Sequence, residues 1–576
     1  MASSGMSLVR RAAEAMRRTP RWQKRLVVLT VGVGTLTYAV QDNRVLQICD
    51  GTGNKKKVVI LGTGWAGASF LRNIDTSLYD VHVVSPRNYF TFTPLLPSVT
   101  CGTVEARSIV EPVRNIVRKR NGAFRFWEAE CFKIDPTNKK IHCRSDVGTN
   151  INGNGEFSVD YDYLIVSVGA RPNTFNTPGV TENCHFLKEV EDAQKIRKSV
   201  LKCFERASLP NLSEEERKKN LHFVVIGGGP TGVEFAAELH DFVNGDLAKL
   251  YPDVKKYVNI SVIEAGGHIL TMFDKRITKF AEEKFKREGI DLKTNFKVVK
   301  VSDKDITMTN SDTGEVYVPY SMAVWSTGIG TRPIIMDFMK DVGQGNRRVL
   351  ATDEWLRVQG CEDVYALGDC ATIAQRKVME DVAAIFRVAD KDNSGTLTVE
   401  KIKHVLGDIY ERYPQVKLYL KSNQMKDFHD LLKNSEGKES KELNIEEFKK
   451  ALAQVDSQVK MLPATAQVAS QQGDYLARCF NRMQTCEQNP EGPIRIRGEG
   501  RHRFKPFRYR HLGQFAPLGG EQTAAQLPGD WVHVGHSTQW LWYSVYASKQ
   551  FSWRTRMLVV SDWGKRFIFG RDSSSL

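Results

Sequence analysis

Two glycine-rich segments have the residue types and spacing of nucleotide-binding turns. GTGWAG spans 62–67 and GGGPTG spans 227–232, and each follows a short apolar run. The first glycine of such a motif permits a tight turn, the second lets the backbone approach a pyrophosphate, and the third allows close packing of a helix against a strand. In that order the glycines are Gly62, Gly64 and Gly67, and then Gly227, Gly229 and Gly232. Two complete motifs predict two bound nucleotides, each with its phosphates at a helix N-terminus.

The order of the motifs indicates which nucleotide each one holds. In flavin enzymes that accept hydride from a nicotinamide, an FAD motif comes first, an NAD motif is inserted, and a late Gly-Asp pair returns to the flavin. Gly368-Asp369 ends the apolar run in YALGDCA, so Asp369 is expected to bond the ribityl chain. SVGARPN at 167–173, which contains Gly169, and STGIGTRP at 326–333 are expected to pass the chain between the two domains. This cofactor pair predicts hydride transfer from NADH to FAD.

One acidic residue bears on the choice between NADH and NADPH. The strand predicted after the second motif, NISVIEA, ends at Glu264. A carboxylate there accepts hydrogen bonds from ribose hydroxyls and repels the extra phosphate of NADPH, so NADH is the expected donor. A solvated glutamate at a strand end is the alternative. The corresponding strand after the first motif ends at Ser85 instead of an acid.

Four longer stretches show a resemblance to a known family. They are SPRNYFTFTPLLPS at 85–98, GGGPTGVEFAAEL at 227–239, AQVASQQGDYL at 466–476 and SWRTRMLVVSDWGKRFIFGRD at 552–572. From residue 50 onward the chain resembles the type II NAD(P)H:quinone oxidoreductases, the non-pumping alternative NADH dehydrogenases, and most of all the calcium-linked external form of plant mitochondria. The resemblance implies noncovalent FAD, NADH as donor and membrane ubiquinone as acceptor. A homodimer is also expected.

The resemblance assigns roles to side chains outside the glycine motifs. Glu234, in the helix after the second motif, would face the flavin and help deliver protons to the quinone; an exposed pair of helix glutamates is the alternative. Gln471 and Gln472 would lie on the quinone side of the flavin and bond a quinone carbonyl, with Tyr475 stacking; a solvated helix face is the alternative. Pro94 matches the segment beside the isoalloxazine ring.

The segment between Asp369 and Pro463 contains an insertion that a two-nucleotide fold does not need. DKDNSGTLTVEK at 390–401 has the outline of an EF-hand calcium loop, with oxygen ligands at positions 1, 3, 5 and 7. These ligands are Asp390, Asp392, Ser394 and the carbonyl of Thr396. Position 12 is Lys401 instead of a bidentate glutamate, which removes two ligand oxygens and adds repulsion. A second, decayed hand spans 436–447, so a structural or partner-docking remnant is the alternative to a calcium site.

Charge is concentrated at the two ends of the chain. Across 576 residues the net charge is +15, and residues 1–25 hold seven basic side chains against one acid, as in an organellar transit peptide. The uncharged run at 26–40 is short for a bilayer span, and a cleaved secretory signal or an apolar linker is the alternative. No other segment is apolar enough to cross a membrane, which argues against a proton pump.

The C-terminal end predicts contact with an anionic membrane surface. Residues 495–510 are rich in arginine, and 531–569 interleave basic residues with many aromatic ones, as in a helix that lies on a bilayer. Nucleic acid is the weaker interpretation, because no nucleic-acid motif accompanies the charge. We therefore expect a peripheral protein of the mitochondrial inner membrane, on the intermembrane-space side. The final SSSL is a weak secondary peroxisomal address.

The ten cysteines include no C-x2-C pair, which argues against zinc, iron–sulfur clusters and a disulfide scaffold. Only Cys101 lies between residues 62 and 130, where disulfide reductases of this fold keep a redox pair. A sulfide:quinone oxidoreductase stays open through Cys131, Cys184 and Cys370. Further alternatives are an NADPH-preferring member, a flavoprotein similar to apoptosis-inducing factor, and a calcium sensor.

The elements that must position these residues predict an α/β fold class. We expect two Rossmann-like dinucleotide-binding domains in a two-dinucleotide-binding flavoprotein fold, an inserted α-helical EF-hand domain and a C-terminal membrane-surface helical domain. The expected divisions are 1–50 for a mitochondrial transit peptide with a candidate anchor, 51–220 and 331–376 for the FAD domain, 221–330 for the NADH domain, 377–455 for the EF-hand insertion, 456–490 for a quinone-site segment and 491–576 for membrane association.

Overall fold

The computed structural model describes most of the chain after residue 54. The described residues are 55–117, 124–145, 155–375, 377–422, 444–453, 455–458, 462–487, 505–529 and 531–574. The predicted leader and apolar run at 1–50 and most of the basic stretch at 495–510 lie outside them. Within these residues no helix is both long and apolar enough to cross a membrane.

The first glycine motif follows the central strand of a five-stranded parallel sheet of order β21-β9-β1-β2-β5. Its strands are β1 (Lys57–Leu61), β2 (Asp80–Ser85), β5 (Phe124–Glu128), β9 (Tyr163–Val166) and β21 (Val364–Ala366). Strand β1 is apolar because both faces of a parallel sheet are covered, and Val58, Val59 and Ile60 have no exposed surface. Helix α3 (Trp65–Asn73) follows the motif, and a meander of β6 (Glu130–Asp135), β7 (Lys140–Arg144) and β8 (Glu156–Asp160) lies beside the sheet.

The second glycine motif stands in a repeat of the same architecture. The parallel sheet has the order β11-β18-β12-β13-β14, and its antiparallel meander has the order β15-β16-β17. The elements are β11 (Cys184–Phe186), β12 (His222–Ile226), α9 (Pro230–Phe242), β13 (Asn259–Glu264), α11 (Lys275–Glu288), β14 (Asp291–Thr294), β15 (Lys297–Val301), β16 (Asp305–Asn310), β17 (Gly314–Pro319) and β18 (Met322–Trp325). The predicted two-domain architecture is confirmed. Its boundary at 221 is wrong, because β11 already pairs with β18 in the second sheet.

The two stretches predicted to connect the domains pair with each other. Strand β10 (Arg171–Pro172) and strand β19 (Ile329–Gly330) form a short antiparallel ladder. Trp325 donates its indole N–H to the carbonyl of Asn173 at 3.0 Å, which adds a side-chain bond to this bridge. The chain therefore leaves and re-enters the first domain at one place.

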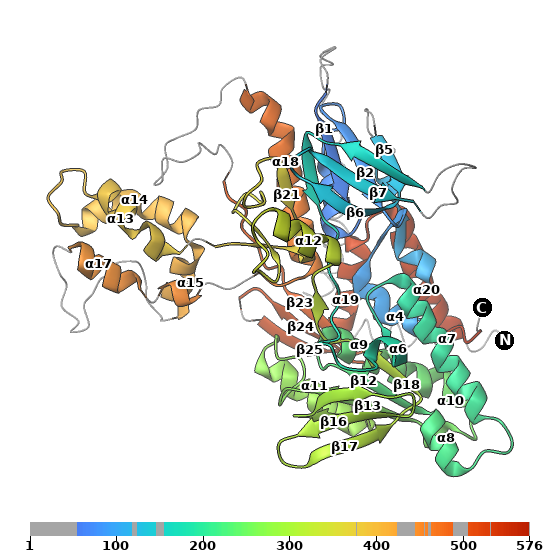
Figure 1. The fold of residues 1–576 in the computed structure, drawn as a ribbon. Helices are drawn as coiled ribbons and strands as arrows, with labels where there is room; N and C mark the ends of the chain where they lie inside the picture. The colour runs from blue at the N-terminus through green and yellow to red at the C-terminus, as the bar shows by residue number, and fades with distance from the viewer. Residues whose placement is uncertain are drawn as a thin grey trace.

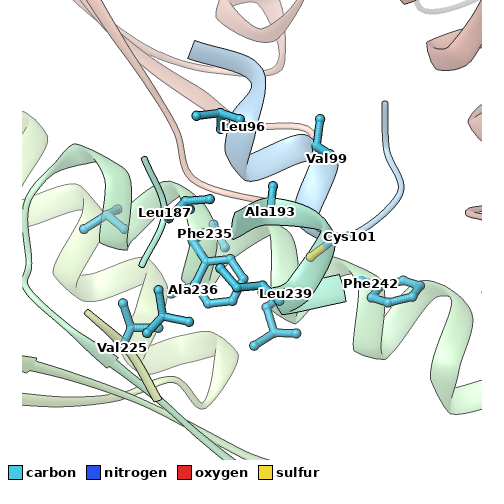
Figure 2. Packing of buried hydrophobic residues seen from close by; sticks show 14 of the residues in the cluster. Leu96, Val99, Cys101, Leu187, Ala193, Val225, Phe235, Ala236, Leu239 and Phe242 are labelled. Carbon is cyan, nitrogen blue, oxygen red and sulfur yellow. The ribbon is translucent and has the colours of Figure 1, made fainter. Parts of the chain in front are cut away.

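Apolar helices fill the space between the two sheets. Figure 2 shows Leu96 and Val99 from α4 (Leu96–Thr100) beside Ala193 from α7 (Val190–Ala207) and Phe235 and Leu239 from α9. All five side chains are at most 3% exposed. The helix after the second glycine motif is thus packed against the first domain, which fixes the two nucleotide turns relative to each other.

The C-terminal segment belongs to this same core. It contains the sheet β23 (Gln514–Pro517), β24 (Thr523–Leu527) and β25 (Trp531–Gly535), then helices α19 (His536–Lys549) and α20 (Trp553–Phe569). Trp542, Tyr543, Val559 and Trp563 are buried in the central cluster together with residues of α4, α7 and α9. The described part of the segment 491–576 is therefore packed against the two nucleotide domains, and its role in membrane association stays a prediction.

The predicted insertion forms a separate helical unit. Figure 1 shows α13 (Val378–Ala389), α14 (Val399–Arg412), α15 (Pro414–Ser422) and α17 (Ile445–Leu452) standing to one side of the two sheets. Their apolar side chains make a core of their own, with Phe386, Ile409 and Phe448 at its centre. The chain then returns as α18 (Ala466–Glu487), which packs along α3.

Short elements complete the described chain. They are β3 (Tyr89–Thr91), β4 (Val110–Pro112), α5 (Val113–Val117), α6 (Val180–Asn183), α8 (Glu214–Asn220), α10 (Ala248–Leu250), α12 (Pro333–Asp341), β20 (Leu350–Thr352) and β22 (Ala371–Ile373). Several short helical turns, described below where they matter, lie between them.

Candidate functional site

The first glycine motif has two crowded glycines and one open glycine. Gly62 has a φ of +93°, and a Cβ there would lie 2.5 Å from the carbonyl oxygen of Ser167. A Cβ at Gly67 would lie 2.1 Å from the carbonyl oxygen of Gly62, so the helix can approach the strand only without a side chain. At Gly64 nothing lies within 4 Å of the added atom. No side chain caps α3 at Gly64, so its first N–H groups are open to a phosphate.

The second motif repeats this arrangement. Gly227 has a φ of +113°, and a Cβ at Gly232 would lie 2.0 Å from the Gly227 carbonyl oxygen. The space around Gly229 is open to 4 Å, and no side chain caps α9 there. Both turns have the crowding and the opening that a bound pyrophosphate requires, so the residues present fit two dinucleotides.

Two serines complete these turns and were not singled out in the sequence. The hydroxyl of Ser167, after β9, donates to the carbonyl of Leu61 at 2.8 Å. The hydroxyl of Ser326, after β18, donates to the carbonyl of Ile226 at 2.9 Å. Each serine Oγ stands within 2.7 Å of the position that a Cβ on the third glycine would take. The signal was the pair of similar stretches SVG and STG, one after each neighbouring strand.

The residues that end the second strand of each sheet differ in chemistry. Glu264 ends β13, and its carboxylate accepts the N–H of Gly228 at 2.6 Å and that of Gly266 at 2.7 Å. It therefore lies against the second glycine motif and is not a freely solvated glutamate. In the first sheet the hydroxyls of Ser85 and Thr63 occupy the equivalent place, 3.0 Å apart. A carboxylate thus lies against the glycine motif in the second sheet only.

Asp369 lies beside the first glycine motif, as the sequence predicts. It stands in a single 3-10 turn, Gly368–Cys370, where Lys188 donates to its carboxylate at 3.3 Å. A Cβ at Gly368 would lie 3.4 Å from that of Ala66 in α3, which places the turn at the start of that helix. Gln472 is buried, and its side-chain oxygen accepts the N–H of Gly368 at 2.7 Å. Gln472 therefore holds the turn that carries Asp369.

Two further predicted contacts of the flavin lie near the same motif. Gly169 follows β9, and no atom lies within 4 Å of where its Cβ would be. Pro94 lies in the turn Thr93–Leu95, whose Thr93 hydroxyl accepts the indole N–H of Trp65 at 2.9 Å. Since Trp65 is the first residue of α3, the segment after β3 is tied to the first glycine motif.

One face of α18 makes hydrogen bonds to the backbone of the segment from Lys505 to Gly513. Gln471 donates to the carbonyl of Arg510 at 2.8 Å and accepts its N–H at 2.9 Å. One turn away on either side, Gln467 donates to the carbonyl of Gly513 at 2.6 Å and Tyr475 to that of Lys505 at 2.8 Å. Three side chains spaced four residues apart therefore hold an extended segment along the helix, and the role of Gln471 and Tyr475 at a quinone stays a prediction.

Glu234 has the environment of a group that exchanges protons. It lies on α9 just after the second motif, and its side chain keeps part of its surface accessible. Its pKa is raised well above the ordinary value by burial and by the charge of Glu238. The charge of Glu234 in turn helps to raise the pKa of Tyr546 in α19, after the larger effect of burial. Glu234 therefore lies close enough to Tyr546 to influence the ionisation of its hydroxyl.

Glu238 is engaged by several partners, so the alternative of an exposed pair of glutamates is wrong. Ser98 donates to its carboxylate at 2.9 Å and Thr103 at 2.8 Å. Arg571 lies 3.4 Å from the same carboxylate and 3.0 Å from that of Asp246. These bonds hold the Glu238 side chain one helical turn from Glu234 and fasten the C-terminus to α9.

Aromatic rings connect the first motif to the C-terminal helices. Trp65 packs edge-on against Phe92 with 5.2 Å between ring centroids, and Phe92 packs against Tyr546 at 5.8 Å. Tyr546 also contacts Phe515 at 6.1 Å. A row of packed aromatic rings therefore runs from the first residue of α3 to Tyr546 in α19.

The four predicted ligands of the EF-hand loop do converge. They surround the Nζ atom of Lys401. Throughout the described chain no group of three or more His, Cys, Asp or Glu side chains is placed to hold a metal ion. The EF-hand identity of this unit stays a prediction.

Known proteins match nearly the whole chain. The pattern of the pyridine nucleotide-disulphide oxidoreductase family matches residues 56–387, and that of the NDH2 C-terminal domain matches 511–572. External alternative NAD(P)H-ubiquinone oxidoreductase B3 of Arabidopsis thaliana mitochondria is 67% identical over 98% of this chain and 99% of its own. The chain belongs to the family of the external alternative NAD(P)H-ubiquinone oxidoreductases. External NADH-ubiquinone oxidoreductase 2 of Saccharomyces cerevisiae is 36% identical over 90% of this chain and 82% of its own.

Solved structures show that this chain has the fold of the family. NDH2 from Plasmodium falciparum in complex with NADH is 33% identical, with a TM-score of 0.79, and covers 90% of this chain and 100% of that one. The sulfide:quinone oxidoreductase of Aquifex aeolicus has a TM-score of 0.55 at 15% identity, which shows a common fold only. The family's relatives are named as mitochondrial proteins.

The cysteines of this family member do not form a disulfide in the described residues. Cys131 and Cys143 face each other on β6 and β7, and Cys370 lies buried next to Asp369. Burial raises the pKa of the Cys101 thiol to about 12. A thiol with so high a pKa is a weak nucleophile at neutral pH. The described cysteines therefore give no support to disulfide exchange as the way electrons leave.

Proposed function

We propose that this chain is a peripheral, non-pumping NADH:ubiquinone oxidoreductase that uses one FAD in two successive half-reactions. One observation carries the proposal: two glycine turns of the same geometry, each with an open second glycine, are fixed within one packed core. A chain with two such turns can bring a nicotinamide to a flavin. The named functions of the family's relatives support this assignment.

The first turn is assigned to FAD and the second to NADH. Gly64 and the N-terminus of α3 would hold the FAD pyrophosphate, Gly169 leaves room for the cofactor, and Asp369 would bond its ribityl chain. Gly229 and the N-terminus of α9 would hold the NADH pyrophosphate, with Glu264 at the ribose. When bound, the flavin accepts a hydride and passes two electrons on. The protein's part is to hold both nucleotides in register.

Glu234 is assigned to proton delivery. Reduction of a quinone to a quinol consumes two protons, and a carboxyl group with a raised pKa holds its proton to higher pH than an ordinary glutamate does. Tyr546 and the row of aromatic rings would lie along the quinone ring on the same side. Gln472 supports the reaction indirectly, because it holds the turn of Asp369.

The simplest test is turnover by the purified, full-length protein. We expect noncovalent FAD, rapid oxidation of NADH by a short-chain ubiquinone, and no reduction of ubiquinone by sulfide. Slow or absent quinone turnover with a tightly held flavin would favour a signalling flavoprotein similar to apoptosis-inducing factor. Sulfide oxidation would favour the sulfide:quinone alternative, whose fold the chain shares.

NADH should be strongly preferred over NADPH. At about 4 Å and an effective dielectric near 20, each unit of phosphate charge meets roughly 4 kcal/mol of repulsion from Glu264, enough for about a hundredfold difference in kcat/KM. Glu264→Gln keeps an acceptor for the N–H of Gly228 and removes the charge, so the preference should fall at least about tenfold. The control is Glu283→Gln, an exposed residue of α11. Equal kcat/KM for both donors in the wild type would contradict the prediction.

The membrane contact is assigned to the outer face of α20. Trp553, Met557, Val560 and Ile568 are 56%, 65%, 49% and 68% exposed and fall on one side of the helix. Large apolar side chains at such exposure, flanked by Arg554, Arg556 and Lys565, are typical of a helix lying on an anionic bilayer. We call these four apolar residues the α20 stripe.

Charges in the α20 stripe should release the protein from membranes. Met557→Glu with Val560→Glu removes apolar burial of a few kcal/mol, so binding to vesicles that contain anionic lipid should weaken about a hundredfold or more. Turnover of a water-soluble quinone should stay unchanged. The matched control is Met272→Glu with Leu250→Glu, which are 55% and 56% exposed on other surfaces. Equal vesicle binding by both double variants would show that α20 does not face the bilayer.

Location and assembly follow the same proposal. We assign the protein to the intermembrane-space side of the mitochondrial inner membrane, as a homodimer, with peroxisomes as a minor destination. Support comes from the named location of the relatives and from the leader-like residues 1–25. The divisions at 1–50, 331–376, 377–455 and 456–490 are kept as domain assignments on the same grounds.

A further inference from the structure

The loop between α13 and α14 encloses the ammonium group of Lys401. The Nζ atom lies 3.1 Å from Asp390 Oδ1 and 2.5 Å from Asp392 Oδ1. It also lies 2.6 Å from Ser394 Oγ and 3.0 Å from the carbonyl oxygen of Thr396. Counted from Asp390, these oxygens stand at positions 1, 3, 5 and 7, which supply metal ligands in an EF-hand loop. One cation therefore meets all four candidate ligands, and that cation is part of the chain.

The rest of the loop is folded tightly around these oxygens. The carboxylate of Asp390 accepts the N–H of Gly395 at 2.8 Å and that of Ser394 at 3.1 Å. The Asp390 side chain is only 8% exposed, and that of Lys401 is 21% exposed. Two carboxylates held this close repel each other unless a positive charge lies between them.

We propose that Lys401 is a built-in substitute for a calcium ion, which holds the loop in its cation-bound arrangement at all times. Its stem begins at position 12, where an EF-hand places the bidentate glutamate that closes around the metal. The same position closes the loop here with a charge of opposite sign. The ammonium group thereby keeps the helical unit in one state without calcium. It also occupies the position that a free divalent ion would need.

The described part of the second hand offers no replacement for this role. Glu447, at position 12 of that hand, accepts the backbone N–H of Asn444 at 3.0 Å and so caps its own helix α17. Phe448 packs edge-on against Phe386 with 6.1 Å between centroids, which couples α17 to the helix before the Lys401 loop. Asp456 accepts the N–H of Val378 at 2.9 Å and ties the two ends of the unit together. The state of one loop is therefore passed to the whole unit.

Two substitutions at Lys401 test whether its ammonium group replaces a calcium ion or whether the loop has only lost a calcium ligand. Lys401→Met keeps most of the stem and removes the charge, so the carboxylates repel and the loop should open. Lys401→Glu restores the closing carboxylate, so the loop should open without calcium and close with it. The same changes at Lys403, an exposed residue two positions on in α14, are the controls. Asp392→Asn removes one partner of the ammonium and should give an intermediate effect.

The experiment uses the full-length, flavin-loaded protein, with limited proteolysis within 377–458 and calorimetric titration of calcium. We expect no calcium binding by the wild type up to about 1 mM, and cleavage of Lys401→Met about tenfold faster than that of the wild type. Lys401→Glu should bind calcium with a Kd of about 10⁻⁵ M and become resistant to cleavage when calcium is present. The Lys403 variants should behave as the wild type does.

Two results would overturn the proposal. Equal resistance of the wild type, Lys401→Met and Asp392→Asn would show that the ammonium does not hold the loop. Micromolar calcium binding by the wild type would show that the ion displaces Lys401. Retention of flavin by each variant reports whether the rest of the chain is folded. Because cleavage and calcium binding are the readouts, the outcome does not depend on whether the protein reduces ubiquinone.

Discussion

Gly67→Ala should yield no stable flavoprotein, whereas Gly64→Ala should yield a folded chain that has lost its flavin. The added methyl group at Gly67 would lie 2.1 Å from a backbone oxygen, and neither backbone segment can move without breaking β1 or α3. Overpacking against backbone in a closed core costs about 3 kcal/mol or more, which is a large part of the stability of a domain. At Gly64 the methyl group meets no protein atom and takes space where the pyrophosphate would lie.

The two variants are told apart by comparing stability with flavin content. Gly67→Ala should lower the Tm sharply even when FAD is added, and Gly64→Ala should leave the Tm of the flavin-free protein unchanged. Gly229→Ala should be the counterpart in the second site, with flavin retained and the KM for NADH raised at least about tenfold. The control is Gly564→Ala in α20, where nothing lies within 4 Å. Full flavin content in Gly64→Ala would show that the open space is not the phosphate site.

Glu234→Gln should slow quinone reduction while leaving flavin reduction by NADH unchanged. Loss of a positioned general acid lowers a rate by on the order of a hundredfold. The wild-type rate of flavin reoxidation should fall as pH rises through the raised pKa of Glu234, because the protonated form is lost. The variant should show a flat profile over that range. Stopped-flow measurement of the two half-reactions checks this, with Glu215→Gln on the exposed helix α8 as control.

The same raised pKa makes a prediction for stability. A carboxyl group whose pKa is higher in the folded than in the unfolded protein stabilises the fold below its unfolded pKa, and that contribution is lost as pH rises through the folded pKa. The glutamine of the variant Glu234→Gln cannot ionise, so the variant does not lose stability in this way as pH rises. The Tm of the variant should therefore rise relative to that of the wild type between pH 5 and pH 9. A constant difference in Tm would mean that Glu234 is already ionised at pH 5.

The glycine turns could be predicted because their signal is local. Strand, glycines and helix follow one another within a dozen residues, and the role of each glycine depends on its immediate neighbours. The serines that complete the turns could not be assigned this way. Ser167 and Ser326 come from strands that pair with β1 and β12 only in the folded sheet. The similar stretches SVG and STG single out the two serines, but the bond that each hydroxyl makes follows only from that pairing.

The polar face of α18 shows a different limit. Gln467, Gln471 and Tyr475 have the spacing of a helix face, and such a face can meet water, a ligand or backbone. The partner here is the stretch from Lys505 to Gly513, which the sequence separates from the helix by residues without a recognisable fold signal. Family resemblance predicts a ligand beside this face, and the structure adds three bonds to backbone that the spacing alone does not indicate.

Lys401 shows what residue type alone leaves out of a prediction about calcium binding. A lysine at position 12 of a calcium loop predicts poor calcium binding, because two ligand oxygens are missing. The length of the lysine stem adds a second effect, since it lets the charge reach the loop's own oxygens. Sequence position identifies the missing ligand, and side-chain reach decides what takes its place.

The tie between the first domain and the last residues has a consequence for how the protein is made. Helix α3 is covered by α18, where Ser69 and Ser470 meet at 2.9 Å, and Arg197 donates to the carbonyl of Asp572 at 2.7 Å. A growing chain therefore exposes the apolar surfaces of its first half until its end leaves the ribosome. Contacts between such distant segments form slowly, so the finished chain stays extended for longer. An extended chain is the form that can be threaded through an organelle's import channel.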